Sequence, residues 1–253
     1  MVVKPALFAL FGLLTGSFLN VCILRVPAHK SVITAPSRCP DCGRRLHPLE
    51  LIPLFSYIAQ RGRCRGCGGK ISAQYPVIEA ANALLWVLAA LRFGSVPQLI
   101  LSCAALSALL GLAVIDGRTG EIPFGFTAFI GVCGVLNISV KLWVNLYFIT
   151  VISYIIGFFA VSLPLYIVYS VTKRRAVGGG DIKLLAASGL FLGWKLVILG
   201  FFAACLTGTV THLTRMKFAG AGRELRLGPY LALGLAFAMF FGDALIDRYI
   251  ILI

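Results

Sequence analysis

Residues 93–115 read FGSVPQLILSCAALSALLGLAVI, a stretch without charge that exceeds the ~20 residues needed to cross a bilayer as a helix. Of the whole chain of 253 residues, 59% are hydrophobic and only 13% are charged, and the mean hydropathy is +0.94. A soluble domain carries roughly 25% charged residues, so a water-soluble globule is excluded. The sequence predicts a polytopic membrane protein, and further charge-free stretches cover residues 5–24, 122–140, 142–172 and 196–214.

The expected fold class is an all-α membrane protein with about eight transmembrane helices, because no alternating pattern indicates barrel strands. Pro164 predicts a kink in the fifth helix. The domains we expect are a transmembrane helix over 1–26, a cytoplasmic loop over 27–75 and a transmembrane helical bundle over 76–253. The predicted helices cover residues 5–26, 76–92, 96–115, 122–140, 146–171, 182–194, 196–214 and 228–251.

The net charge of +14 predicts the orientation of the chain in the membrane. In the eight-helix arrangement, 18 of the 23 Lys and Arg residues share one side of the membrane. Basic loops stay in the cytoplasm, so both termini are expected outside. This topology accounts for the positive charge, so no nucleic-acid partner is expected. An arrangement of six helices would keep this orientation up to residue 183. The loops expected in the cytoplasm are 27–75, 116–123, 172–183 and 215–227.

Four of the eight cysteines form two CxxC pairs within the polar loop, separated by a 21-residue spacer. Two residues between thiols let both sulfurs of a pair reach one metal ion, and a glycine after each pair relieves the tight turn. Four thiolates suit tetrahedral Zn²⁺ and leave no open coordination position, which indicates a structural site. Disulfides, the alternative, are disfavoured in the cytoplasm. The predicted zinc ligands are Cys39, Cys42, Cys64 and Cys67.

Two of the nine acidic residues stand out, Asp116 at the end of a predicted helix and Asp181 in the sequence GGGDIK. The predicted topology places both at the cytoplasmic face. Two carboxyl groups brought close together do not both ionise cheaply, so one keeps a proton. Such a pair suits peptide hydrolysis, because the ionised aspartate activates water while the protonated one donates a hydrogen bond to the scissile carbonyl.

Simpler roles exist for each acidic residue alone. Asp116 is then an interfacial cap or the partner of Arg118, and Asp181 caps the following helix. The occurrence of both beside glycines on one membrane face favours the catalytic interpretation. Glu79 is either a third member of this site or an interfacial glutamate.

The chain resembles a known family, the bacterial type IV prepilin peptidases. These are bifunctional leader peptidase/N-methyltransferases of the GxGD class of membrane aspartyl proteases. A lone GxGD motif would be weak support, but the matching segments follow one another along almost the whole chain. They cover residues 16–25, 39–68, 71–79, 116–123, 178–186 and 228–234.

The resemblance implies an aspartic endopeptidase of the bacterial inner membrane with its active site facing the cytoplasm. Its implied substrates are prepilins and pseudopilins of type IV pilus, type II secretion or competence systems. Cleavage would follow the glycine that ends a short basic leader, and S-adenosylmethionine would then methylate the new N-terminus. Asp116 and Asp181 would be the catalytic pair and the four cysteines the zinc site. No Rossmann-type glycine motif is present, so the methyl-donor site is not located.

Two other classes of function fit parts of the sequence. A small proton-coupled transporter with a regulatory zinc loop would place its carboxylates near the bilayer midplane and show two matching halves. The sequence has neither feature. A zinc-loop scaffold for the assembly of a secretion system would leave both aspartate motifs unexplained.

Overall fold

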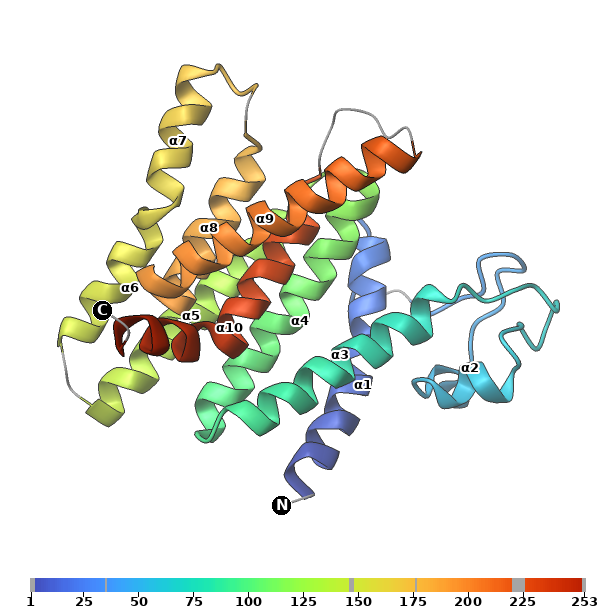
Figure 1. Cartoon of the computed structure of the whole chain (residues 1–253). Helices are drawn as coiled ribbons and strands as arrows, with labels where there is room; N and C mark the ends of the chain where they lie inside the picture. The colour runs from blue at the N-terminus through green and yellow to red at the C-terminus, as the bar shows by residue number, and fades with distance from the viewer. Residues whose placement is uncertain (1–2, 35, 146–147, 176, 220–225, 252–253) are drawn as a thin grey trace. The chain divides into compact units, whose positions relative to one another are not determined.

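The computed structural model describes residues 3–34, 36–145, 148–175, 177–219 and 226–251. The regular structure within these ranges is helical, apart from isolated β-bridges in one loop, which confirms the predicted all-α class. Figure 1 shows the order of the helices along the chain. The chain divides into two compact units, Met1–Gly94 and Ser95–Ile253.

The first unit is built on the helices α1 (Val3–Arg25) and α3 (Gln74–Arg92), which pack along one another. Small residues permit the close approach, because a Cβ atom at Gly16 would lie 2.9 Å from the Cα of Glu79. The Asn82 side chain donates a hydrogen bond of 2.7 Å to the carbonyl of Gly12. At the other end of the pair, Lys4 Nζ donates to the carbonyl of Phe93. The two helices therefore form an antiparallel hairpin.

The loop of the first unit contains two short helices that the sequence analysis did not predict, η1 (Pro48–Leu51) and α2 (Phe55–Ala59). A capping box starts η1, because the ring of His47 accepts from Leu49 N–H and the Glu50 carboxylate accepts from His47 N–H. Local capping explains such short elements, which are too brief to show a hydrophobic period.

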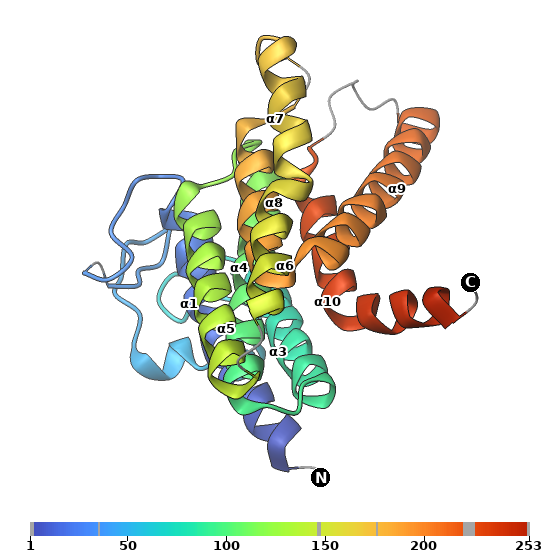
Figure 2. The ribbon, with the colours of Figure 1, turned by 90° about the vertical axis from the view of Figure 1, so that its left-hand side faces the viewer.

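The second unit consists of helices packed around α8 (Gly179–Leu192), which contacts α5, α6, α7, α9 and α10. Most of the α8 side chains are buried, and Figure 2 shows this helix behind α6 and α7. The other helices of this unit are α4 (Val96–Thr119), α5 (Phe124–Asn145), α6 (Phe148–Ala160), α7 (Ser162–Val171), α9 (Trp194–Ala219) and α10 (Gly228–Ile251), and α4 packs on α5 and α10.

Several helix boundaries differ from those predicted, including the ends of α5 at Asn145 and α9 at Ala219, which were expected at residues 140 and 214. The helix predicted over 146–171 breaks at Val161 into α6 and α7, because Pro164 cannot donate the hydrogen bond that would continue the helix. Residues 146–147, at its predicted start, lie outside the described residues. The helix predicted to end at residue 115 continues to Thr119, where Gly120 caps it in the left-handed conformation. Asp181 lies inside the first turn of α8 and does not cap it, since the cap is Gly178.

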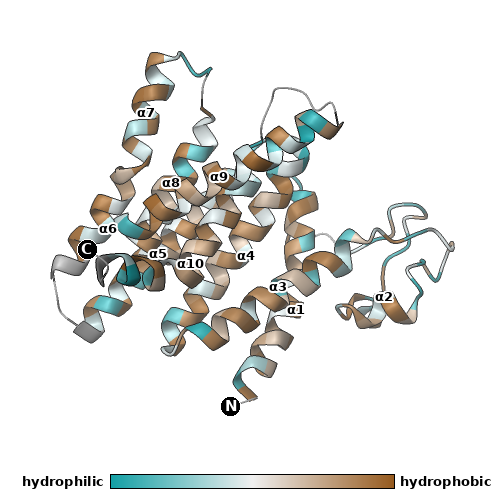
Figure 3. Ribbon diagram, in the orientation of Figure 1, coloured by the Kyte–Doolittle hydropathy of each residue, from teal (hydrophilic) through white to brown (hydrophobic). Residues whose placement is uncertain are grey.

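Seven candidate membrane spans are present among the described residues. One of them joins α6 to α7, over Val151–Val171, and the short helix α8 is not a candidate. At 14 residues, α8 is shorter than the ~20 residues that span a bilayer. Hydrophobic residues are spread along all the long helices in Figure 3, as a lipid environment requires. The chain is a multi-pass membrane protein.

Pairs of glycines bring helices of the second unit into backbone contact. A Cβ atom at Gly157 in α6 would lie 2.7 Å from the carbonyl carbon of Gly193, and one at Gly189 in α8 would overlap the carbonyl of Gly157. In the same way, a Cβ at Gly200 in α9 would lie 3.1 Å from the carbonyl oxygen of Gly234 in α10. Small residues at helix crossings are typical of packing in membranes, where close contact replaces the hydrophobic driving force.

Candidate functional site

The four predicted zinc ligands come together in the loop of the first unit. Their sulfur atoms all lie within 4.8 Å of one another, and the Sγ atoms of Cys39 and Cys67 are 3.9 Å apart. Thiolates at ~2.3 Å from a tetrahedral metal ion lie about 3.8 Å from one another. The cluster therefore fits one four-coordinate metal ion.

The two CxxC segments fold in the same way. Gly43 N–H donates to the carbonyl of Cys39, and Gly68 N–H donates to the carbonyl of Cys64, at 3.0 and 2.9 Å. Both glycines have positive φ angles, of 69° and 72°, which a side chain would strain. An isolated β-bridge closes each segment, Arg38 with Arg45 and Arg63 with Lys70. The glycine that follows each pair in the sequence thus has the predicted role of relieving a tight turn.

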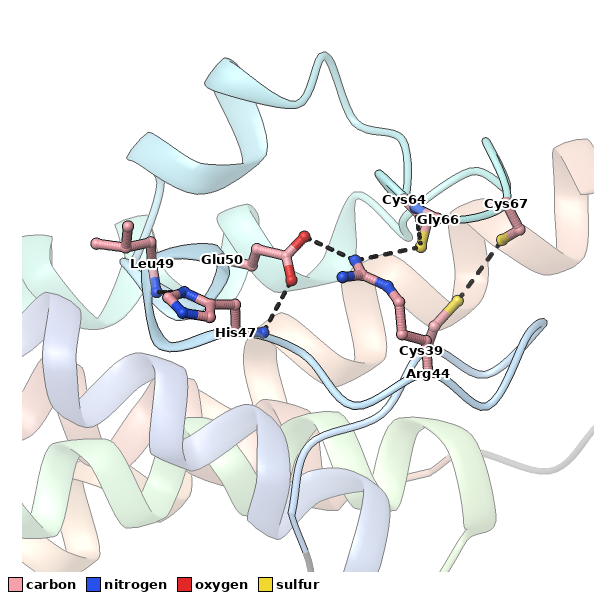
Figure 4. Close-up of polar contacts among 8 residues, drawn as sticks. All are labelled: Cys39, Arg44, His47, Leu49, Glu50, Cys64, Gly66 and Cys67. Atoms are coloured by element: carbon pink, nitrogen blue, oxygen red, sulfur yellow. Dashed lines mark hydrogen bonds and ion pairs between the residues drawn. The ribbon is translucent and has the colours of Figure 1, made fainter.

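A salt bridge lies directly beside the sulfur cluster (Figure 4). Arg44 Nη2 is 2.7 Å from Glu50 Oε1 and 4.0 Å from the sulfur of Cys64. The guanidinium and the N–H of His47 hold the pKa of Glu50 below its usual value. Hydrogen bonds from the backbone N–H groups of Cys67 and Gly66 lower the pKa of Cys64 to about 6. These hydrogen bonds favour the thiolate of Cys64, the form that binds a metal, whereas the neighbouring thiols and burial raise the pKa of Cys67 to about 11.

Asp116 lies in the last turn of α4 and is 5% exposed. Its Oδ2 atom accepts a hydrogen bond of 3.0 Å from the backbone N–H of Gly228, the first residue of α10. Arg226 donates from its guanidinium to the carbonyl of Gly117, and its charge acts on Asp116. The carboxylate is thus fixed between the end of one helix and the start of another.

Asp181 lies in the first turn of α8, in the same compact unit as Asp116. The backbone N–H of Gly178 donates a hydrogen bond to the Asp181 carboxylate. A Cβ atom at Gly180 would lie 2.7 Å from the Cβ of Ile122, so the segment after α4 packs against the start of α8. This contact joins the two aspartate motifs, which are far apart in the sequence.

Glu79 belongs to the first unit and is 6% exposed. Its Oε2 atom accepts a hydrogen bond of 2.8 Å from the backbone N–H of Leu54, just before α2. Leu54 has a φ angle of 59°, which is unfavourable for a residue with a side chain. Glu79 therefore holds the loop to the hairpin, a contact that neither sequence interpretation anticipated.

Sequence reasoning missed two groups near Asp116, the N–H of Gly228 and the guanidinium of Arg226. The available signal was the Gly-Pro pair at the start of the last apolar stretch, since helix starts present free N–H groups to carboxylates. It also missed Arg44 and Glu50, whose charges look like ordinary surface residues in the sequence.

Two protein-family models match the chain, one after the other along the sequence. A family model described as "Bacterial Peptidase A24 N-terminal domain" matches residues 10–93, and one described as "Type IV leader peptidase family" matches residues 103–213. The second range contains Asp116 and Asp181.

Several curated relatives are named "Prepilin leader peptidase/N-methyltransferase". A protein of Bacillus subtilis is 33% identical over 95% of this chain and 96% of its own length. One of Myxococcus xanthus is 35% identical over 88% of this chain and 66% of its own length. One of Pseudomonas aeruginosa is 29% identical over 95% of this chain and 91% of its own length. No solved structure matches. With similarity of this extent along nearly the whole sequence, the chain belongs to the type IV leader peptidase family.

Proposed function

We propose that this chain removes the short basic leader from type IV prepilins or pseudopilins, after the glycine that ends the leader, and then N-methylates the new N-terminal residue. The observation that carries the proposal is that Asp116 and Asp181 belong to one compact unit, where the segment after α4 packs on the start of α8 through Ile122 and Gly180. The name of the relatives and the matched family support the same activity. A proton-coupled transporter is not favoured, because this family membership supports a peptidase.

In the proposed mechanism the two aspartates have different roles in hydrolysis. One is ionised and takes a proton from a water molecule, whose oxygen attacks the scissile carbonyl carbon. The other is protonated and donates a hydrogen bond to the carbonyl oxygen, where negative charge develops. As the C–N bond breaks, the leaving nitrogen receives the proton that the first aspartate took from water, and the products are a leader with a new carboxyl terminus and a mature chain with a free amine.

The methyl donor that we propose is S-adenosylmethionine, and the metal is Zn²⁺ held by the four cysteines. Zinc with four sulfur ligands would fix the loop and take no part in the hydrolysis. In this proposal residues 27–75 form a metal-binding loop in the cytoplasm, and residues 76–253 include the peptidase bundle. The membrane would be the bacterial inner membrane.

The activity is tested by incubating the purified chain with a prepilin and S-adenosylmethionine and following the prepilin by mass spectrometry. We expect loss of the leader, followed by the mass of one added methyl group. Omission of S-adenosylmethionine should abolish only the second change. A prepilin that stays intact would contradict the proposed peptidase.

The metal content gives a separate prediction. We expect about one zinc ion per chain, because the four sulfurs surround a single tetrahedral position. The double variant Cys39→Ser with Cys42→Ser should lose the zinc, as measured by metal analysis of the purified protein. Cys22→Ser, in the same unit but outside the cluster, is the matched control and should keep it. Purified protein without metal, and with all four thiols open to alkylation, would rule the site out.

The orientation gives another prediction, tested with an impermeant thiol reagent on single-cysteine variants. Ser31→Cys, Thr119→Cys and Lys173→Cys should label only after lysis, because residues 27–75, 116–123 and 172–183 are expected at the cytoplasmic side. Ser95→Cys, in the loop between α3 and α4, should label in intact cells with a permeabilised outer membrane. Labelling of Thr119→Cys, but not Ser31→Cys, from outside would show that the proposed topology is wrong.

A further inference from the structure

The segment from η1 to α2 exposes apolar side chains, although it belongs to a strongly basic loop. Five of them are between 41% and 71% exposed, and we refer to these as the apolar ridge. Phe55 and Ile58 are three residues apart in α2 and so share one face of that helix. The ridge consists of Leu49, Leu51, Ile52, Phe55 and Ile58.

No free charge interrupts this surface. Between residues 48 and 60 the only charged residue is Glu50, which is 8% exposed and paired with Arg44. Figure 3 shows hydrophobic colouring over α2, whereas hydrophilic residues mark the segments that carry the cysteines. Exposed arginines follow directly at Arg61 and Arg63. An uncharged apolar face with basic residues at its edge is typical of segments that lie in a membrane interface.

A hydrogen bond fixes the level of this segment along the hairpin. The α3 helix, at 19 residues, is about 28 Å long, close to the ~30 Å of a hydrocarbon core. Glu79 is five residues into the candidate span Gln74–Arg92, or about 7 Å from its start. Because the Glu79 carboxylate is 2.8 Å from the N–H of Leu54, the start of α2 lies beside the span and not beyond it.

We propose that the apolar ridge inserts into the bilayer that surrounds the chain, at the boundary between headgroups and acyl chains. Glu79 holds the segment at the level of this boundary, and Arg61 and Arg63 meet anionic headgroups. The metal-binding loop is therefore anchored to the membrane surface along η1 and α2, in addition to its two ends at α1 and α3. This proposal is independent of the chemistry of the two aspartates.

The test places a tryptophan on the ridge and measures its surroundings. Full-length Phe55→Trp is reconstituted into phosphatidylcholine–phosphatidylglycerol vesicles with brominated acyl chains, and the fluorescence of the unmodified chain is subtracted. The added fluorescence should be mostly lost to the bromine atoms and should be protected from iodide in the water. Arg45→Trp, an exposed position in the same loop, is the matched control and should show the opposite pattern.

A second measurement does not depend on an added tryptophan. The double variant Phe55→Ser with Ile58→Ser should keep its metal, yet the amides of residues 49–60 should exchange hydrogen faster in vesicles than those of the unmodified chain. Quenching of Phe55→Trp by iodide but not by bromolipid would overturn the proposal, because the ridge would then face water. Protection from both quenchers would also overturn it and would indicate a protein partner. Unchanged amide exchange in the double variant would also contradict insertion of the ridge into the bilayer.

Discussion

Replacing either Asp116 or Asp181 with asparagine is expected to lower leader cleavage by about 10³-fold, since a positioned acid or base contributes 10²–10⁴-fold. Asparagine keeps the size of the side chain and its capacity to accept a hydrogen bond, but it cannot take a proton from water. In this change the buried Asp116 loses its charge and one oxygen becomes an NH2 group, while the remaining amide oxygen can accept from the N–H of Gly228. Cleavage is measured as the rate of leader loss from a purified prepilin.

The matched control for these variants is Glu121→Gln, which makes the same carboxylate-to-amide change at an exposed position five residues after Asp116. It should cleave at the rate of the unmodified chain. Thermal unfolding of each variant in detergent separates lost chemistry from lost fold. Near-normal cleavage by a well-folded Asp116→Asn or Asp181→Asn chain would exclude the two-aspartate mechanism.

The second large effect is expected at Gly228, where alanine should lower cleavage by about 10²-fold, the usual result of displacing a reacting group by roughly 1 Å. A Cβ atom at this position would lie 2.5 Å from the Oδ2 atom of Asp116 and 2.7 Å from its Cγ. Either the carboxylate moves or its hydrogen bond from the Gly228 N–H breaks. The rate constant of cleavage should fall more than the affinity for the prepilin, because this N–H holds a catalytic group and does not touch substrate.

Gly125→Ala is the matched control, since a Cβ atom there would meet no neighbour within 4 Å. Its cleavage and unfolding temperature should remain close to those of the unmodified chain. If Gly228→Ala cleaves normally, the hydrogen bond to Asp116 has no role in positioning it. If it only weakens prepilin binding, Gly228 contributes to the substrate site instead.

The class of fold was predictable because lipid imposes a simple requirement on the sequence. Five of the seven candidate spans contain a long run without charge, and such runs can be recognised without knowledge of neighbours. The break at Val161 was placed only approximately, since Pro164 indicates a kink but not the residue at which the hydrogen bonds stop. The start of α8 was placed late because glycines at residues 178–180 resemble a loop, whereas here they permit close contacts such as Gly180 with Ile122.

The candidate site was predictable where a short sequence motif determines the local conformation of the backbone. The CxxC spacing and the following glycine determine a local turn, so four sulfurs in one place can be expected from the sequence. The partners of Asp116 and Glu79 could not be expected, because Gly228 and Leu54 reach them through packing between distant segments. A backbone N–H donor also cannot be recognised from the type of residue that carries it. The catalytic roles of Asp116 and Asp181 stay predictions until the variants are measured.

The glycine pairs at the helix crossings have a consequence for the genetics of this chain. Every missense change of a glycine codon adds a Cβ atom, since glycine alone lacks one. At Gly157, Gly189, Gly200 and Gly234 that atom would meet the backbone of a neighbouring helix. Random mutagenesis followed by selection for lost pilus assembly should therefore recover these codons as often as those of the aspartates. The alleles would differ in kind, because the glycine alleles reduce the amount of protein in the membrane, whereas the aspartate alleles leave it in place.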